Sequence, residues 1–195
     1  MKKIKIPLLL IFALGLVSPG SSQGILAGWH TFNGDTTTDT ASDLYENFTA
    51  TITGGQGEAT NRNLSNLTYG DSSFTFSAAD NSTGINLNTN SNGNRRVFVT
   101  VTNNTGAEFT VDNLYFDLQT YFGTNNGSMT VSHLSSQSDL VDQFNNRSLG
   151  TITLSGNDHS TIHQSTVSTS TMADVTLADG QTAAFRFKLN TTGTS

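Results

Sequence analysis

Three aspartates recur at every fourth position in a threonine-rich stretch near the start of the chain. Asp35, Asp39 and Asp43 carry carboxylate oxygens, which are the ligands that Ca²⁺ prefers in proteins. Their spacing differs from that of an EF-hand, whose ligands alternate at every second position. The sequence therefore offers calcium as a candidate cofactor at these residues. It favours the simpler alternative, a solvated acidic loop, and the polar stretch over residues 36–42 predicts an exposed loop.

Sugar recognition is the second chemistry that the residue types suggest. A sugar-binding face needs exposed aromatic rings flanked by polar side chains, and Tyr115 and Tyr121 are our candidate carbohydrate-binding residues. Arg95 and Arg96 lie near them in sequence only. The alternative is that the tyrosines stand at the edge of the core with their hydroxyl groups in water.

The sequence gives no pattern for catalysis. The chain has only three glutamates, Glu46, Glu58 and Glu108, and their spacing does not pair them as a glycosidase requires. No Gly-x-Ser-x-Gly motif is present, so nothing local indicates a serine hydrolase. His159 and His163 would suit zinc on a helix, but their neighbours are poor helix formers and predict loop histidines. We expect no catalytic residues and no enzyme.

Composition excludes several other classes of protein. The 195 residues include no cysteine, which excludes a disulfide scaffold, a Cys-ligated metal site and a thiol nucleophile. Nine basic residues against 15 acidic ones give a formal net charge of −6. A nucleic-acid-binding protein needs a basic surface, so we expect no nucleic-acid partner.

Residues 1–22 have the features of a secretory signal peptide. Lys2, Lys3 and Lys5 precede an apolar run over residues 6–17, and small residues follow it. The run is shorter than the roughly 20 residues of a membrane span. A buried N-terminal helix, the alternative, would have three lysines at one end. We therefore expect an exported, acidic protein, extracellular or on the cell surface, with no membrane span in the mature chain.

After the leader, short stretches of alternating β-branched or aromatic and polar residues follow one another, which is the pattern of half-buried strands. They lie at residues 25–32, 48–53, 74–78, 85–87, 97–101, 109–118, 129–131, 152–154 and 185–189. Asn103 to Gly106 is a turn sequence typical of a hairpin between two of them. We predict an all-β, antiparallel two-sheet sandwich, jelly-roll-like, forming a single domain over residues 23–195.

One segment departs from the strand pattern. Leu140, Val141 and Phe144 fall on one stripe at helical spacing, and Ser138 is suited to cap the start of a helix. The sequence therefore predicts a short helical segment near residues 138–145.

The order of several segments resembles exported bacterial proteins of the PEP-CTERM (exosortase-sorted) class. The segments are residues 25–32, 97–118, 142–144, 149–151, 177–181 and 185–187. The resemblance implies a β-sandwich from a bacterium that makes exopolysaccharide. We therefore expect a non-enzymatic protein with a structural or interaction role at the cell surface or in the extracellular matrix. Its partners would be extracellular polysaccharide or surface proteins, and the alternative is a carbohydrate-binding module, with or without calcium.

The sequence also departs from this class. Members continue past the last strand into a further strand, a Pro-Glu-Pro motif, a transmembrane helix and a basic tail. None of these occurs before Ser195. The resemblance thus implies either a domain truncated at its C-terminus or a protein without the anchor, and the sorting function is not carried over.

Overall fold

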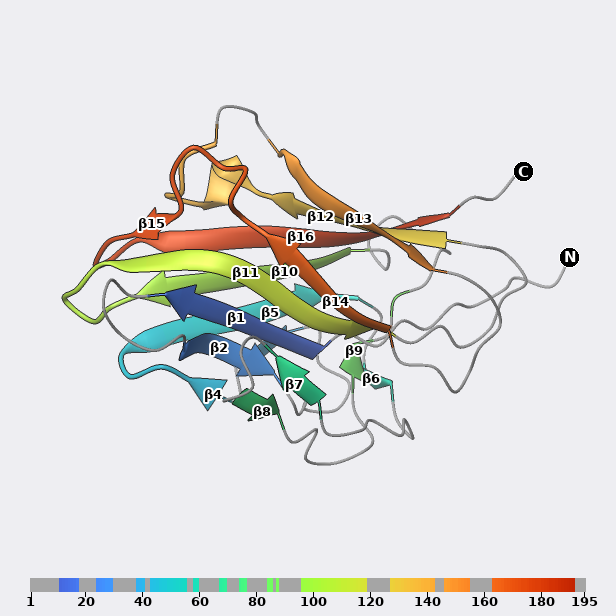
Figure 1. Ribbon diagram of the computed structural model, residues 1–195, viewed down its shortest axis with the longest axis horizontal. Coiled ribbons are helices and arrows are strands. Elements are labelled where there is room, and N and C mark those ends of the chain that lie inside the picture. Colours follow the sequence, from blue (N-terminus) through green and yellow to red (C-terminus); the bar gives the residue numbers. More distant parts are fainter. Residues whose placement is uncertain are drawn as a thin grey trace, which may run out of the picture.

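The structure, a computed structural model, describes residues 11–17, 24–29, 38–40, 43–55, 58–59, 67–69, 74–76, 84–85, 87, 96–118, 127–142, 146–154 and 163–191. Antiparallel strands form almost all of the regular structure in these residues, and they are arranged as two large sheets and two short ladders (Figure 1). The predicted all-β antiparallel sandwich is confirmed.

Sheet I has five strands in one continuous order and a sixth that joins from the side. The order is β14 (His163–Ser168), β11 (Phe109–Leu118), β1 (Ile11–Val17), β2 (Gly24–Trp29) and β4 (Asp43–Leu44). The sixth strand, β15 (Thr176–Leu177), pairs with the start of β11.

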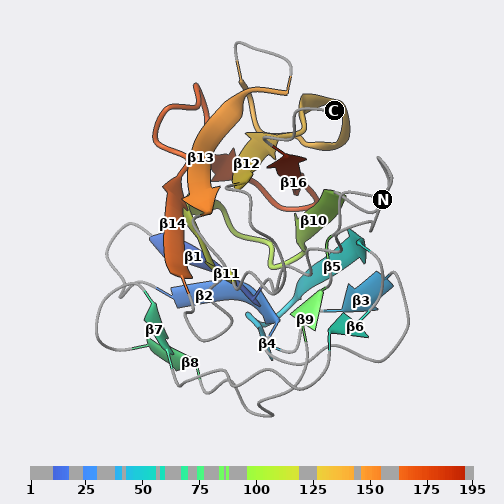
Figure 2. The ribbon, with the colours of Figure 1, turned by 90° about the vertical axis from the view of Figure 1, so that its right-hand side faces the viewer.

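Sheet II has six strands and curves around the other side of the core (Figure 2). Their order is β13 (Ser148–Leu154), β12 (Gly127–His133), β16 (Thr182–Thr191), β10 (Arg96–Asn103), β5 (Phe48–Gly54) and β3 (Thr38–Thr40). Two short ladders lie outside these sheets: β6 (Glu58–Ala59) with β9 (Gly84–Ile85), and β7 (Leu67–Tyr69) with β8 (Phe74–Phe76).

The two sheets enclose one hydrophobic core. Strand β10 shows the predicted alternation, because Val97, Val99 and Val101 are buried and the residues between them are half-buried. Aromatic residues join the layers: the rings of Phe116 in sheet I and Phe187 in sheet II meet edge to face, 5.1 Å apart. Burial of such rings supplies much of the driving force for folding.

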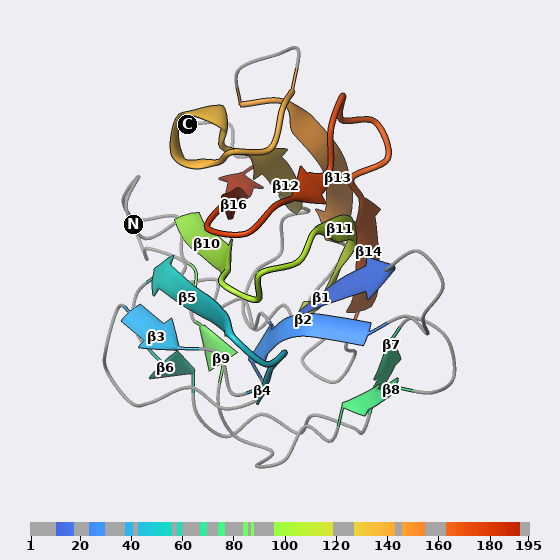
Figure 3. The same cartoon turned by 90° about the vertical axis from the view of Figure 1, so that its left-hand side faces the viewer.

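The predicted hairpin at Asn103 is wrong. Its two flanking strands belong to different sheets, so the connection crosses from one layer to the other, as the end-on view shows (Figure 3). The buried Asn103 amide donates to the carbonyl oxygens of Ala107 and Leu177, at 2.7 and 2.8 Å. The side chain therefore ties the end of β10 to β15 of the opposite sheet, a use that the turn chemistry of the sequence does not reveal.

The predicted helix over residues 138–145 is also wrong in its described part. A single 3₁₀ turn, η1 (Ser135–Gln137), precedes this segment, and Ser138 has extended backbone angles. The polar groups that would begin a helix bond to β16 instead: Asp139 N–H donates to Thr182 O, and Thr182 N–H donates to Asp139 Oδ2, both at 2.7 Å. Leu140 is buried while Val141 is 54% exposed, so the helical stripe is not used. Residues 143–145 lie outside the described residues.

Strand β1 comes from the segment that we predict to be a signal peptide. It lies between β11 and β2 and pairs antiparallel with both, from Ile11 opposite Asp117 to Val17 opposite Thr110 on one side (Figure 1). On the other side, Phe12 is opposite Trp29 and Leu16 is opposite Gly24. The leader stays a prediction. In this structure part of that segment is a central strand of sheet I.

Candidate functional site

Two of the three aspartates of the candidate calcium site are described, and they lie in different sheets. Asp39 is in β3 of sheet II, opposite Ile52, and Asp43 is in β4 of sheet I, opposite Gly28. Asp35 lies outside the described residues. The loop predicted over residues 36–42 is wrong at 38–40, where threonines, which favour strands, form β3. Among the residues that the structure describes, no group of three or more His, Asp or Glu side chains could hold a metal ion. Calcium at these aspartates stays a prediction.

The two candidate carbohydrate-binding tyrosines are not brought together in the described part of the chain. Tyr115 is half-buried on β11 between the buried Leu114 and Phe116, so it faces outward from sheet I, opposite Thr166 of β14. Tyr121 lies outside the described residues. Of the two candidate loop histidines, His163 begins β14 and is thus not in a loop, while His159 falls outside the described ranges.

The outer face of sheet II gathers side chains that the sequence analysis did not combine. Arg96 on β10 is directly opposite Lys188 on β16, and Arg186 is opposite Phe98 two positions along. Directly opposed residues share one face of a sheet, and diagonal neighbours are within reach of long side chains. All four residues are half-buried, on the opposite face from the valines that enter the core. Three cations and one aromatic ring therefore lie side by side on the outside of the sandwich.

The charged side chains of the strands that form this face are all positive. Strands β13, β12, β16, β10 and β5 contain no aspartate or glutamate, although the chain has 15 acidic residues. Burial and the neighbouring charge of Arg96 lower the pKa of the Arg186 guanidinium from its usual value. Among the described residues, the Nε atoms of both arginines are buried and have no hydrogen-bond partner. Nearby cations with unused donors favour an anion beside them.

Hydroxyl groups surround the cations in rows that run across the strands. Thr51 and Thr100 are linked through their Oγ1 atoms at 2.7 Å, and Thr102 and Thr182 at 2.8 Å. On the other side of the cations, the Asn190 amide donates to Thr130 Oγ1 at 2.6 Å. These bonds hold the side chains in defined positions, so the face presents ordered hydrogen-bonding groups. We call the outer side chains of β5, β10, β16 and β12 the hydroxyl face.

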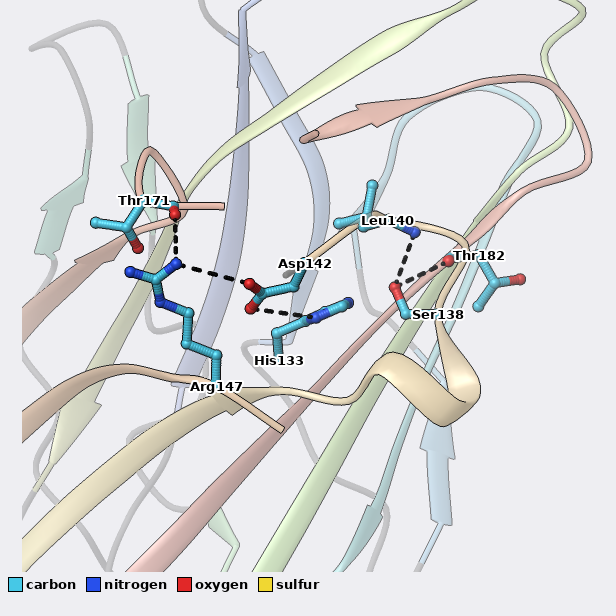
Figure 4. A network of polar contacts seen from close by, with 7 residues as sticks. All are labelled: His133, Ser138, Leu140, Asp142, Arg147, Thr171 and Thr182. Carbon is cyan, nitrogen blue, oxygen red and sulfur yellow. Dashed lines mark hydrogen bonds and ion pairs between the residues drawn. The ribbon is translucent and has the colours of Figure 1, made fainter. Parts of the chain in front are cut away.

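A second cluster of polar groups is buried between β12 and the turn near Thr171 (Figure 4). Asp142 lies between His133, with Nδ1 to Oδ2 3.9 Å, and Arg147, with Nη1 to Oδ1 3.6 Å. Arg147 Nη1 also donates to Thr171 O at 2.8 Å. The side chains of His133 and Asp142 are fully buried, whereas that of Arg147 is 32% exposed. The cluster thus links β12, the start of β13 and the turn near Thr171.

A histidine beside a carboxylate can act as a general base, but here it lies inside the protein. Burial lowers the pKa of His133, and the negative charge of Asp142 partly offsets this. Among the described residues, neither ring nitrogen of His133 has a hydrogen-bond partner. The imidazole also packs against Phe185, with ring centroids 6.1 Å apart. The cluster is therefore best described as a structural element.

Sequence reasoning missed both groups for different reasons. Arg186 and Lys188 alternate with Phe185, Phe187 and Leu189, so their shared outward face was open to prediction. The pairing of β10 with β16 joins residues about 90 positions apart, and no local pattern indicates it. The cluster of His133, Asp142 and Arg147 depends on the same kind of long-range folding, and its residues look unremarkable in sequence.

Comparison of the chain with models of known protein families, with curated proteins and with solved structures finds no match. Among the described residues, no helix is long and apolar enough to cross a membrane. The hydroxyl face, with its three cations, is the main surface on which a functional proposal can be built.

Proposed function

We propose that this chain is an exported, non-enzymatic β-sandwich that acts by binding at the bacterial cell surface or in the extracellular matrix. The hydroxyl face is the contact surface in this proposal. The observation that supports it is the set of ordered threonine pairs, Thr51 with Thr100 and Thr102 with Thr182, on adjacent strands. Because these groups are already held in place, binding through them costs less conformational entropy than binding through free side chains.

The location rests on the sequence. The leader-like N-terminus and the resemblance to the PEP-CTERM class both support export, and membership of that class is part of this proposal. A sandwich with an excess of uncharged hydroxyl groups also suits an extracellular polymer, whose own hydroxyl groups offer matching hydrogen bonds.

A carbohydrate-binding module is the second candidate, and Phe98 favours it. This residue is half-buried on the hydroxyl face, opposite Arg186 and two positions from Arg96 on its own strand, with Thr53 opposite it on β5. Aromatic rings with an apolar face and polar neighbours suit the mixed surface of a sugar. Tyr115 faces outward from sheet I instead, so it does not share a surface with Phe98.

Cell fractionation tests the proposed location. The full chain, produced with a C-terminal tag in a Gram-negative bacterium, is expected outside the cytoplasm and associated with the surface or matrix fraction. Recovery of the intact chain, leader included, only in the cytoplasm would contradict the proposal.

Retention on the matrix tests the proposed surface. The double variant Thr51→Val/Thr100→Val keeps the shape of both side chains and removes the linked hydroxyl groups. It is expected to wash off the matrix at lower salt or detergent than the parent chain. Thr166→Val on β14, an exposed threonine of sheet I, is the matched control and should behave like the parent. Equal retention of all three proteins would contradict a role for the hydroxyl face.

A further inference from the structure

We propose that Arg96, Arg186 and Lys188 form a site for the carboxylate groups of an acidic polysaccharide. The inference rests on the proposed function, since it names the class of polymer that the hydroxyl face would bind. Three observations support it: the placement of the cations, the absence of acidic residues from five adjacent strands, and the hydroxyl groups on both sides.

The placement provides a compact cationic centre. Arg96 and Lys188 are directly opposite each other, and Arg186 is the diagonal neighbour of Arg96 on the same face. Arginine presents donors in a planar fork that matches a carboxylate, and lysine adds a compact charge. Burial and the repulsion from Arg96 both lower the pKa of Arg186, and a bound carboxylate would relieve that repulsion.

The charge distribution of the described strands also favours an anionic ligand beside the cations. After removal of the predicted leader, the chain keeps only six basic residues, and three of them lie in this cluster. No aspartate or glutamate lies in β13, β12, β16, β10 or β5 to neutralise them. An acidic protein that concentrates half of its cations on strands without a carboxylate is suited to an anionic ligand there.

The surroundings favour a polysaccharide over a nucleic acid. DNA carries about one charge per 1.7 Å of its axis, so the rest of this acidic chain would repel it strongly. An acidic polysaccharide has spaced carboxylates separated by hydroxyl groups. On β10, Arg96 and Phe98 are followed by Thr100 and Thr102. Thr102 is paired with Thr182 of β16, which lies beyond the buried Ala184. A polymer lying along these strands would meet a charged centre and then a neutral hydrogen-bonding surface.

Native affinity electrophoresis of the full chain tests the proposal with four polymers in the gel. Polygalacturonate supplies carboxylates, dextran sulfate supplies sulfates, dextran is neutral and DNA supplies phosphates. We expect polygalacturonate to retard the chain, dextran to have a smaller effect, and added salt to weaken the retardation by polygalacturonate.

Variants then locate the site. Arg96→Gln/Arg186→Gln is expected to weaken binding to polygalacturonate by about tenfold or more, equivalent to about 1.4 kcal/mol. Arg62→Gln/Arg95→Gln removes the same number of charges and is the matched control, expected to stay within about twofold of the parent. Thermal unfolding confirms that each variant is folded. Lys188→Gln gives an independent, milder test if the double variant fails to fold.

Any of four results would overturn the proposal. The first is no retardation by polygalacturonate at low salt. The second is an equal loss of polygalacturonate binding in both double variants, which would indicate that binding depends only on the net charge of the chain. The third is binding of DNA or dextran sulfate as strong as that of polygalacturonate and equally sensitive to Arg96→Gln/Arg186→Gln, which would remove the preference for carboxylates. If the chain is retained on the matrix and Arg96→Gln/Arg186→Gln is retained equally well, this inference is overturned while the proposed function stays intact.

Discussion

At the scale of single residues, Gly54 holds the end of β5 against the start of β10. Its φ of +99° lies in the left-handed region, and a Cβ atom there would collide with the carbonyl oxygen of Arg96. The next residue, Gly55, donates its N–H to that same oxygen at 2.8 Å. The position of Arg96 on the hydroxyl face therefore depends on a glycine at 54.

Gly54→Ala is expected to lower the free energy of unfolding by about 2–5 kcal/mol, because left-handed strain adds to a backbone collision. Gly106 is the matched control, since it has a similar φ of +77° but nothing within 4 Å of an added Cβ. Gly106→Ala should cost about 1–2 kcal/mol from strain alone. Urea unfolding measures both changes in the free energy of unfolding. Equal changes would show that the collision with Arg96 does not add to the destabilisation.

His133 is expected to make stability depend on pH. Burial lowers its pKa in the folded protein, so the unfolded chain takes up a proton first as the pH falls below about 6.5. The stability that depends on an uncharged His133 is therefore fully present above that pH. It declines as the pH falls toward the folded pKa, by at most about 1.4 kcal/mol per unit.

Urea unfolding of the parent and of His133→Gln between pH 8 and pH 5 checks this expectation. The variant should lose the decline that the parent shows below pH 6.5. His163→Gln is the control and should keep it. A parent chain with the same stability at pH 7.5 and pH 5.5 would contradict the assignment of a lowered pKa to His133.

At the scale of elements, alternation was a reliable guide wherever one strand face is buried. Strands β5, β10, β12 and β16 match predicted segments because each places apolar side chains at every second position. The alternation in β11 is interrupted near Asn113, where β1 shifts register between Gly15 and Leu16, opposite Asn113 and Val111. Turn residues were a weaker guide, because Asn103 suits a sheet crossing as well as a hairpin.

Strand β1 leads to a prediction about the chain without its leader. A protein that begins at Gln23 lacks the strand between β2 and β11, and the ladders on both sides lose their partner. We expect its Tm to fall by about 10 °C or more, and the exposed strand edges to promote self-association.

A synthetic peptide of residues 9–19 provides the complementary test. Added to the shortened chain, it should raise the Tm and reduce association, whereas a peptide of the same composition in scrambled order should not. Calorimetry and light scattering measure these effects. A shortened chain that is monomeric and as stable as the full chain would contradict a structural role for β1.

At the scale of the whole molecule, the sequence predicted the kind of fold but not the arrangement of its surfaces. The two-sheet sandwich followed from composition, alternation and turn residues, which are local properties. The hydroxyl face arises from the pairing of β10 with β5 and with β16, which are distant in sequence. The tyrosine prediction missed this face because it chose aromatic residues by type, whereas Phe98 stands out only once its neighbours across the strands are known.

The central claim is that the chain binds through the hydroxyl face, and hydrogen exchange of backbone amides tests it most directly. Exchange is measured on the full chain with and without oligogalacturonate. We predict that protection increases in peptides from β10 and β16, which carry Arg96, Phe98, Arg186 and Lys188. Peptides from β14 and from the outer part of β11 around Tyr115 should not change. Protection that increases only in peptides from β11 and β14 would contradict this claim and would place the binding site on sheet I.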